Sequence, residues 1–478
     1  MRTSIWAALI LLSGAALGSC IATKTDSEGE GGSGGGALGG SPGTGGATDA
    51  GSAGEGGASD SGGETGEGGE GGEGGEGGGD APGPLVEEGL IGPVTLHIDI
   101  GKELLTTDVM KQMTGDAAGN LWLFFDYGEQ GQAIQKFDST FKLEWTLAPI
   151  LTSNAQPVTM TQMATTSAGD LLVTGSTPSA LPGQTSAGAD DLFIGKFAPD
   201  QKRIFLRQFG SDSDEKGEYI ALSKDGSFLV SGNEAQPLPG GQSLEYGGPF
   251  VIRYDADGTR TATLQTGDFG QGFLDPVVDS EHAFYATAPY VDSNYPVDKY
   301  AGDGKLLWEF PDTYSQPRKI AVTDHGKYVY LFGGSFGGAS CTLEQLSADG
   351  TLRWTRKGSS FETEGPHGYH GEFSNCGPLL ASENAVYIAG STLSLFLDGG
   401  EGGAGGNSGA DQGGSAMFVA RFDNNGNQVW YRQIALTGDA FTAPVALALD
   451  AAGNPVLACQ DEAVGFVTKL HAKDGSLF

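Results

Sequence analysis

The sequence predicts an all-β fold, a single seven-bladed β-propeller of four-stranded antiparallel blades. One strand-turn-strand unit recurs along the chain, and a lone alternating strand, Val94–Ile100 (VTLHIDI), precedes the first complete unit. Four-stranded antiparallel units in radial repetition form a propeller. We expect the lone strand to pair with the last unit and close the ring, because closure removes exposed sheet edges. A tandem of two smaller propellers is the alternative fold.

The repeated unit is clearest at Phe418–Ile434, which reads FVARFDNNGNQVWYRQI. An alternating strand leads into the polar turn Asp423–Gly426, and the second strand carries Trp430. Such a turn between apolar runs predicts a hairpin, because Gly adopts the required positive φ. The strand that precedes this turn occurs in seven copies, at 133–137 (AIQKF), 193–197 (FIGKF), 250–254 (FVIRY), 296–300 (PVDKY), 342–346 (TLEQL), 418–422 (FVARF) and 466–470 (FVTKL).

The last unit shows the order of its strands. Strands are expected over 444–450, 454–460 and 465–471, and Lys473–Gly475 turns into a fourth strand that stops at Phe478. Residues 279–300 depart most from the pattern, because their opening stretch DSEHAFYATAPY lacks the Gly of the first turn. The fourth unit is therefore the least regular of the seven.

These patterns resemble secreted bacterial β-propeller (SBBP-like) repeats, with their D-x-x-G-N-x-Y-V-x-G-like strand and F-V-A-K-F/L-D-x-x-G-like hairpin. The resemblance covers residues 93–478 and implies seven blades. Its motifs concern the fold and are nearly silent on function.

The first 20 residues predict export. Arg2, the apolar run Ile5–Leu12 and a small-residue end are typical of a signal peptide, and the segment is too short to span a bilayer. Leu17–Cys20 resembles the lipobox of bacterial lipoproteins, which implies cleavage before Cys20 and its acylation. More than one acyl chain is needed for stable anchoring, and a three-chain lipoprotein meets that need. An ordinary signal peptide with a chance cysteine is the alternative.

Residues 21–92 predict a disordered Gly/Glu-rich linker. They include GEGGEGGEGGEGGG at 66–79 and contain 14 acidic side chains and one basic side chain. Such a segment buries too little apolar surface to offset its ordering entropy, and its glutamates repel one another. We expect a flexible tether that holds the domain of residues 93–478 away from a membrane.

The net charge of residues 93–478 is −22 of the total −34. A domain this acidic is not expected to bind nucleic acid or an anionic lipid surface. Contact with the membrane is expected through the lipid anchor alone, and the domain is expected to be monomeric. The residue after Cys20 is not Asp, which by resemblance to lipoprotein sorting favours the outer membrane of the cell envelope. Periplasmic and surface exposure both remain open.

Three cysteines follow Cys20 in an oxidising compartment. Cys341 opens one repeated strand, and Cys376 is placed in the loop that leads into the next unit. Because neighbouring units touch, Cys341 and Cys376 are candidates for a disulfide, and two free thiols are the alternative. Cys459 is expected to be buried and free.

The long insertions predict where a ligand binds. Within each unit, the turn between strands 1 and 2 (turn 1–2) and the turn between strands 3 and 4 (turn 3–4) are short. The loop between strands 2 and 3 (loop 2–3) and the loop from strand 4 to strand 1 of the next unit (loop 4–1) contain every long insertion. In a meander these two classes lie at opposite ends, and elaborated loops on a rigid scaffold are the usual place for binding. The four insertions are Ser176–Asp190, Asn233–Gly248, Gly358–Cys376 and Ser391–Ser415.

One loop is chemically suggestive as a metal or acid/base site. His367, His370 and Glu372 form an HxxHxE sequence that could hold a metal or supply an acid/base pair, although a polar loop with ordinary histidines is the favoured interpretation. Asp255–Gly258 and Asp423–Gly426 faintly resemble calcium loops, but both lack the distant bidentate Glu and both stand where a hairpin turn is needed.

No catalytic residue and no cofactor is predicted, because the P-loop, the G-x-S-x-G elbow and the dinucleotide fingerprint are absent from the sequence. The function that we expect is a membrane-tethered, non-catalytic binding or scaffold module, with an unknown protein or carbohydrate ligand on the face of the long loops. A propeller enzyme, a hydrolase or lyase acting on polysaccharide or peptide, is the alternative. It would need ionisable side chains that converge near the ring axis. A purely structural envelope component is the third possibility.

Overall fold

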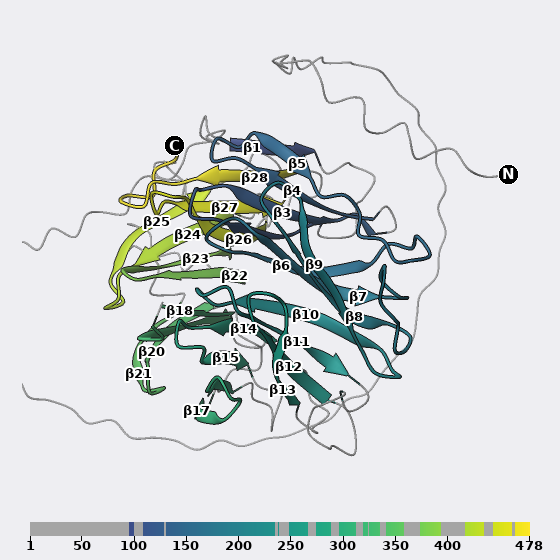
Figure 1. Cartoon of the computed structure of the whole chain (residues 1–478). Helices are drawn as coiled ribbons and strands as arrows, with labels where there is room; N and C mark the ends of the chain where they lie inside the picture. The colour runs from purple at the N-terminus through teal and green to yellow at the C-terminus, as the bar shows by residue number, and fades with distance from the viewer. Residues whose placement is uncertain are drawn as a thin grey trace, which may run out of the picture. The chain divides into compact units, whose positions relative to one another are not determined.

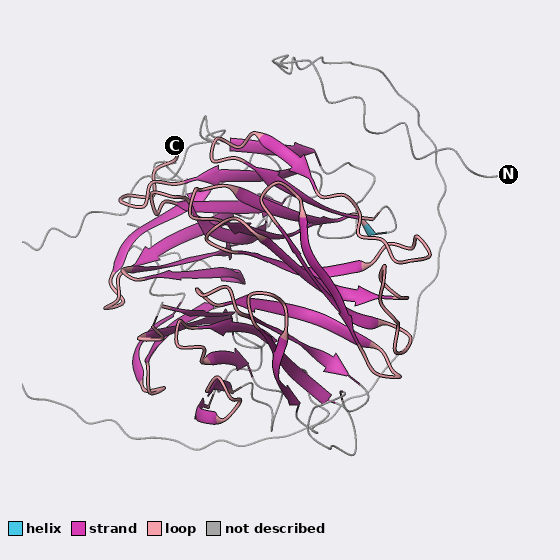
Figure 2. Cartoon of the chain, in the orientation of Figure 1, coloured by secondary structure: helices cyan, strands magenta, loops and turns pink. Residues whose placement is uncertain are grey.

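The computed structural model describes most of the compact unit Gly77–Phe478. The described residues form 28 strands and no α-helix. Figure 2 shows that strands and the loops between them make up nearly all of the described chain. These residues are 95–99, 109–128, 131–234, 238, 248–265, 274–287, 296–311, 319–323, 325–334, 341–357, 373–392, 416–434, 443–460 and 464–478.

Seven four-stranded antiparallel sheets contain all of these strands and form a β-propeller (Figure 1). We number them blades 1 to 7 in chain order. Blade 1 contains β2 (Met110–Gly115), β3 (Leu121–Asp126), β4 (Gln132–Phe137) and β5 (Leu143–Thr146). Blade 2 contains β6 (Thr159–Thr165), β7 (Leu171–Thr177), β8 (Asp191–Phe197) and β9 (Arg203–Phe209). Blade 3 contains β10 (Glu215–Leu222), β11 (Phe228–Glu234), β12 (Gly248–Tyr254) and β13 (Arg260–Gln265).

The remaining blades repeat this order of strands. Blade 4 contains β14 (Leu274–Val278), β15 (Phe284–Thr287), β16 (Val297–Tyr300) and β17 (Leu306–Phe310). Blade 5 contains β18 (Lys319–Val322), β19 (Tyr328–Gly334), β20 (Cys341–Ser347) and β21 (Leu352–Lys357). Blade 6 contains β22 (Phe373–Ser382), β23 (Ala385–Thr392), β24 (Ala416–Phe422) and β25 (Gln428–Ile434). Blade 7 contains β26 (Ala443–Leu449), β27 (Pro455–Gln460), β28 (Val464–Lys469) and β1 (Thr95–Asp99).

The ring closes through the first strand of the chain. β1 pairs antiparallel with β28, from Thr95 opposite Thr468 to Asp99 opposite Val464. Figure 1 shows this purple strand beside the yellow end of the chain. The predicted pairing of Val94–Ile100 with the last unit is confirmed. No further strand follows β28, because β1 already supplies the fourth strand of blade 7, and an isolated bridge joins Leu470 to Leu477.

The core lies between neighbouring blades. Seven clusters of buried apolar side chains each draw their members from two adjacent blades. Phe125 of blade 1 packs in a cluster with Val467 of blade 7, whereas Trp122 on the same strand packs with Phe193 of blade 2. Because both faces of β3 are buried, its sequence LWLFF is an unbroken apolar run.

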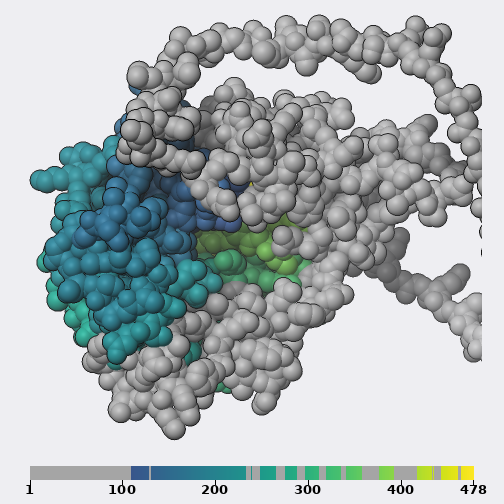
Figure 3. Space-filling view, turned by 90° about the vertical axis from the view of Figure 1, so that its right-hand side faces the viewer, coloured from purple at the N-terminus to yellow at the C-terminus, as the bar shows by residue number. Residues whose placement is uncertain are grey.

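The first strands of neighbouring blades contact one another at all seven junctions. We call them the inner ring; it consists of β2, β6, β10, β14, β18, β22 and β26. We call the end with turns 1–2 and 3–4 the turn face, and the opposite end the long-loop face. On the long-loop face, Ser153 N donates to Ala180 O at 2.8 Å, and Asp190 N donates to Asp214 Oδ1 at 3.0 Å. In Figure 3, green residues of later blades are visible beside the blue residues of the first blades.

The turns explain why blade 4 forms without its glycine. In the 1–2 turns of blades 1 and 7, Gly119 and Gly453 both have φ near +80°. In blade 4 the same position is taken by His282, with φ +65°, and His282 N donates to Asp279 O as the glycines do in theirs. A positive φ at a residue with a Cβ costs about 1–2 kcal/mol, and the burial of the rest of the blade offsets this cost.

Tryptophans of the outer strands join blades at four of the seven junctions. The indole N–H of each of four tryptophans donates to a carbonyl in the 3–4 turn of the following blade. The pairs are Trp145 with Pro199 O (2.9 Å), Trp308 with Ala348 O (3.0 Å), Trp354 with Asn424 O (3.3 Å) and Trp430 with Ala472 O (2.9 Å). The rings of Trp308, Trp354 and Trp430 also cover the Gly of that turn: a Cβ on Gly426 would lie 2.8 Å from the Trp354 ring.

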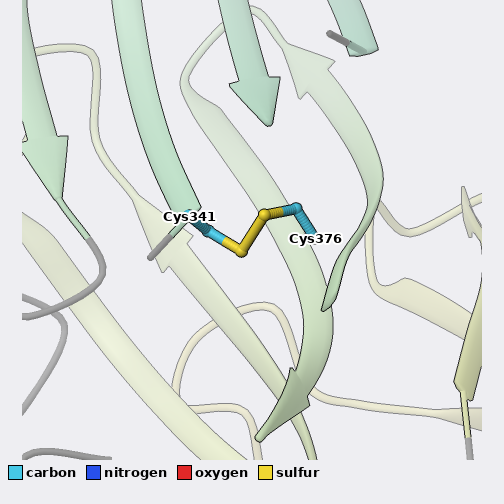
Figure 4. The surroundings of a disulfide bond; sticks show 2 residues. All are labelled: Cys341 and Cys376. Carbon is cyan, nitrogen blue, oxygen red and sulfur yellow. A yellow bond between two sulfur atoms is a disulfide. The ribbon is translucent and has the colours of Figure 1, made fainter. Parts of the chain in front are cut away.

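A disulfide joins blades 5 and 6 (Figure 4). Cys341, the first residue of β20, is bonded to Cys376, with 5.6 Å between their Cα atoms. Cys376 lies within β22 and not in a loop. Its placement in a loop was wrong, because the sequence around it (FSNCGPLL) does not alternate, and the ladder with β23 is interrupted between Cys376 and Leu379.

Among the residues that the structure describes, no helix has the length and apolarity needed to cross a membrane.

Candidate functional site

The inner ring carries irregularities near the long-loop face. In five of its strands one residue bulges out of the ladder within the first four residues of the strand. The bulged residues are Lys111, Thr161, Glu218, Ser374 and Val445. In β14 the ladder is interrupted between Leu274 and Val277. Bulges redirect side chains and are enriched next to active and binding sites.

The irregular stretch of β14 contains a strained residue. Asp275 has φ +46°, although the residue before a proline disfavours helical conformations and Pro276 follows it. A left-handed conformation outside Gly costs about 1–3 kcal/mol and persists only where its surroundings enforce it. Lys319 of β18 donates to Asp275 Oδ2 at 2.6 Å. This contact joins the inner strands of blades 4 and 5.

Tyr219 of β10 completes the group that we call the inner-ring cluster: Tyr219, Asp275 and Lys319. Burial raises the pKa of the Tyr219 hydroxyl, and the Asp275 carboxylate raises it further. Burial lowers the pKa of Lys319, but the charge of Asp275 and its hydrogen bond outweigh this effect, so the pKa rises overall. The raised pKa values favour a neutral hydroxyl at Tyr219 and an ammonium group at Lys319, and the cluster joins them to the Asp275 side chain across three consecutive blades.

Exposed lysines accompany the cluster. Lys319 keeps 53% of its side chain exposed, and Lys111 and Lys216, each second in its inner-ring strand, are exposed as well. The domain as a whole is strongly acidic. These lysines share this end of the inner ring with the acidic side chains of Glu215, Glu218 and Asp275, so the described residues there carry charges of both signs.

The other lysines of the repeat belong to the turn face. Three of them pair with acids at the 1–2 turns of their own blades: Lys196 with Asp170 (3.3 Å), Lys299 with Asp279 (3.9 Å) and Lys469 with Asp450 (4.0 Å). These lysine side chains are largely buried. The Lys of motifs such as FIGKF is thus part of the scaffold.

The turns that resemble calcium loops use their carboxylates internally. Asp255 Oδ1 accepts hydrogen bonds from Asp257 N (3.1 Å) and Thr259 N (2.7 Å). Asp423 Oδ1 accepts two in the same way, from the main chain of Asn425 and Asn427 at 2.8 Å. The acid at the first position of these hairpins is accounted for by the turn itself.

The other sequence-predicted site residues lie outside the described part of the chain. They are Cys20, His367, His370 and Glu372. Of the four long insertions, only the segment 176–190 is fully described, and it ends on the long-loop face. In the described ranges no group of three His, Cys, Asp or Glu side chains is arranged to hold a metal. Cys459 is buried and free, as expected, and burial raises the pKa of its thiol.

Sequence reasoning missed the inner-ring cluster. Its three residues are far apart in the chain, and the sequence separation of Asp275 and Lys319 alone is 44. The available signal was a charged residue in the first strand of a unit, where apolar residues would complete the core. Lys111, Asp275 and Lys319 carry that signal, which becomes meaningful once first strands are known to be innermost.

Comparisons with known proteins add the following. No family profile and no curated protein matches this chain. Among solved structures, the chain is similar to Kuenenia stuttgartiensis hydrazine synthase at 12% identity and a TM-score of 0.46, over 77% of this chain and 97% of that one. It is similar to the C-terminal WD40 domain of Sif2 at 13% identity and a TM-score of 0.41, over 79% and 99%. A protein from Lactobacillus plantarum follows at 16% identity and a TM-score of 0.38, over 64% and 80%. None of these likenesses bears on activity.

Proposed function

We propose that this protein is an extracytoplasmic, lipid-anchored propeller that binds a polar, acid-bearing ligand at the long-loop face without transforming it. The observation that carries the proposal is the convergence of Tyr219, Asp275 and Lys319 on the inner ring. A hydroxyl, an ammonium group and a carboxylate together can donate to and accept from a saccharide or peptide. Lys111 and Lys216 add charge that attracts an anionic group.

The electrostatics of the cluster favour binding over catalysis. A lysine nucleophile requires a lowered pKa, and a tyrosine that acts as a base requires the same. Both pKa values are raised instead. A hydrolase or lyase built on this cluster would lack an activated group, so the enzymatic alternative has the weaker support.

The proposed location of the protein, at a membrane, depends on the lipid anchor and the linker. Leu17–Cys20 supports lipidation at Cys20, and the acidic linker of residues 21–92 keeps the domain at a distance from the bilayer. We propose residence in the outer membrane, as a monomer. The variant Cys20→Ala is expected to move the protein from the membrane fraction to the soluble fraction and to abolish labelling with radioactive palmitate. Unchanged membrane association would contradict the anchor.

A binding titration tests the proposed ligand class. The full chain is titrated with oligogalacturonate and with poly-glutamate, and neutral dextran serves as the control. We expect binding to at least one acidic probe, weakened by salt, and recovery of the probe at its original length. Binding to neither acidic probe would contradict the ligand class, and shortened probe would contradict the non-catalytic role.

A further inference from the structure

Two buried carboxylates from neighbouring blades converge on one point beside Gly210. Asp191 is the first residue of β8 in blade 2, and Glu215 is the first residue of β10 in blade 3; both are 0% exposed. A Cβ built on Gly210 would collide with Asp191 Oδ1 and would lie 2.6 Å from Glu215 Oε2. The two oxygens therefore face the same small space, which only a residue without a side chain leaves open.

Hydrogen bonds hold both carboxylates in this orientation. Asp191 Oδ2 accepts from Ser186 Oγ at 2.9 Å, from Ala187 N at 3.0 Å and from the side-chain amide of Gln208. Glu215 Oε1 accepts from the hydroxyl of Ser211. The network therefore leaves Asp191 Oδ1 directed at the shared space.

Asp191 Oδ1 has no hydrogen-bond partner within the described ranges, and no Lys or Arg among them forms an ion pair with this carboxylate. A buried carboxylate oxygen without a donor costs about 1–3 kcal/mol or more. A bound cation at Asp191 Oδ1 removes this cost, because buried charges are normally paired or coordinate metals.

We propose that Asp191 Oδ1 and Glu215 Oε2 bind a hard divalent cation, Ca²⁺ in preference to Mg²⁺. Carboxylate oxygens are the ligands that these ions prefer, and Ca²⁺ tolerates the irregular geometry of a junction between two blades. With two carboxylates the affinity is that of weak extracellular sites, roughly 10⁻⁴–10⁻³ M. The cation fastens loop 178–190 of blade 2 to residues 210–214 on the long-loop face. This site is separate from the inner-ring cluster and does not depend on the proposed function.

Hydrogen–deuterium exchange of the full chain tests the site. Exchange is compared in about 5 mM CaCl₂ and in excess EGTA at equal ionic strength. This Ca²⁺ concentration is above the expected dissociation constant. Peptides over 184–191 and 208–216 are expected to exchange several-fold to roughly tenfold more slowly with Ca²⁺. Peptides over 147–158, a loop on the same face at the junction of blades 1 and 2, are expected to be unaffected. Because exchange is resolved peptide by peptide, Ca²⁺ bound to the acidic linker would not by itself protect these two segments and leave 147–158 unchanged.

Three variants complete the test. Asp191→Asn removes a ligand and Gly210→Ala fills the space, so either is expected to abolish the Ca²⁺-dependent protection. Asp298→Asn alters another buried aspartate and is expected to retain it. Equal exchange of the unaltered chain in Ca²⁺ and EGTA overturns the proposal. So does protection that persists in a folded Asp191→Asn variant, or protection that appears in EGTA only on acidification, which would show a shared proton in place of a cation.

Discussion

Tyr300 donates its hydroxyl to Asp298 Oδ2 at 2.8 Å in the junction of blades 3 and 4. Asp298 is 5% exposed, and burial raises the pKa of its carboxyl to about 6, although the Tyr300 hydrogen bond acts in the opposite direction. The native state therefore favours the protonated carboxyl more than the unfolded chain does.

The raised pKa of Asp298 predicts that its ionisation lowers the free energy of unfolding as the pH rises. Since the folded pKa lies above the unfolded value, the contribution of Asp298 to stability is full below about pH 4 and is lost as the pH rises through about 6. Asp298→Asn is expected to raise the free energy of unfolding at pH 7.5 by about 1–3 kcal/mol and to change it little at pH 4. Urea unfolding at both pH values measures this difference. A variant that is less stable at pH 7.5 would contradict the account.

Two glycines with the same backbone conformation test the tryptophan contacts. Gly453 has φ +80° and open space around it, whereas Gly426 has φ +79° and lies under the Trp354 ring. Gly453→Ala is expected to cost about 1–2 kcal/mol, the strain of a left-handed alanine. Gly426→Ala is expected to cost about 1–3 kcal/mol more, because the ring must shift. Equal losses in thermal or urea unfolding would show that the ring contact contributes nothing.

The disulfide closes a loop with a sequence separation of 35. Replacing both Cys341 and Cys376 with Ala is expected to lower the free energy of unfolding by about 3–4 kcal/mol. Cys459→Ala, at a buried free thiol, serves as the matched cysteine control and is expected to lose less. Titration of thiols in denaturant is expected to find Cys459 and, where it is not acylated, Cys20. Two additional reactive thiols would contradict the disulfide.

Ring closure predicts a sharp difference between two truncations. Removal of residues 1–92 leaves β1 in place and is expected to preserve the unfolding temperature. Removal of residues 1–100 takes away the partner of β28 and several ladder hydrogen bonds, each worth about 0.5–1.5 kcal/mol. It also leaves an open sheet edge, so the shorter chain is expected to be less stable and to aggregate. Identical behaviour of both truncations would contradict the role of β1.

The repetitive parts of the fold could be predicted from the sequence because they are local. Each hairpin carries its own signals, as Asp423–Gly426 does with its turn and Trp430 with its outer strand. The closing strand could be predicted because it had no partner nearby. Blade 4 shows the limit of turn chemistry: His282 takes a conformation that usually requires Gly, since tertiary packing overrides the local preference.

The candidate site could not be predicted in the same way. Tyr219, Asp275 and Lys319 belong to three different strands far apart in the chain, and only the ring brings them together. Asp191 and Glu215 likewise read as ordinary acids near turns, because nothing local shows that Gly210 leaves a space between them. The placement of Cys376 failed for a related reason, since a bulged strand lacks the alternation that identifies strands.

The central claim is that the long-loop end of the inner ring holds the ligand. The most direct test compares Lys319→Ala with Lys305→Ala. Lys305 is also exposed, but it lies in the 3–4 turn of blade 4 on the turn face. Both variants lose one positive charge, so non-specific attraction changes equally. Isothermal titration with the acidic probe that binds best is expected to show at least a tenfold weaker affinity for Lys319→Ala, since a hydrogen bond to a charged group contributes about 1.5–3 kcal/mol, and an unchanged affinity for Lys305→Ala. Equal affinities of the two variants would contradict the claim.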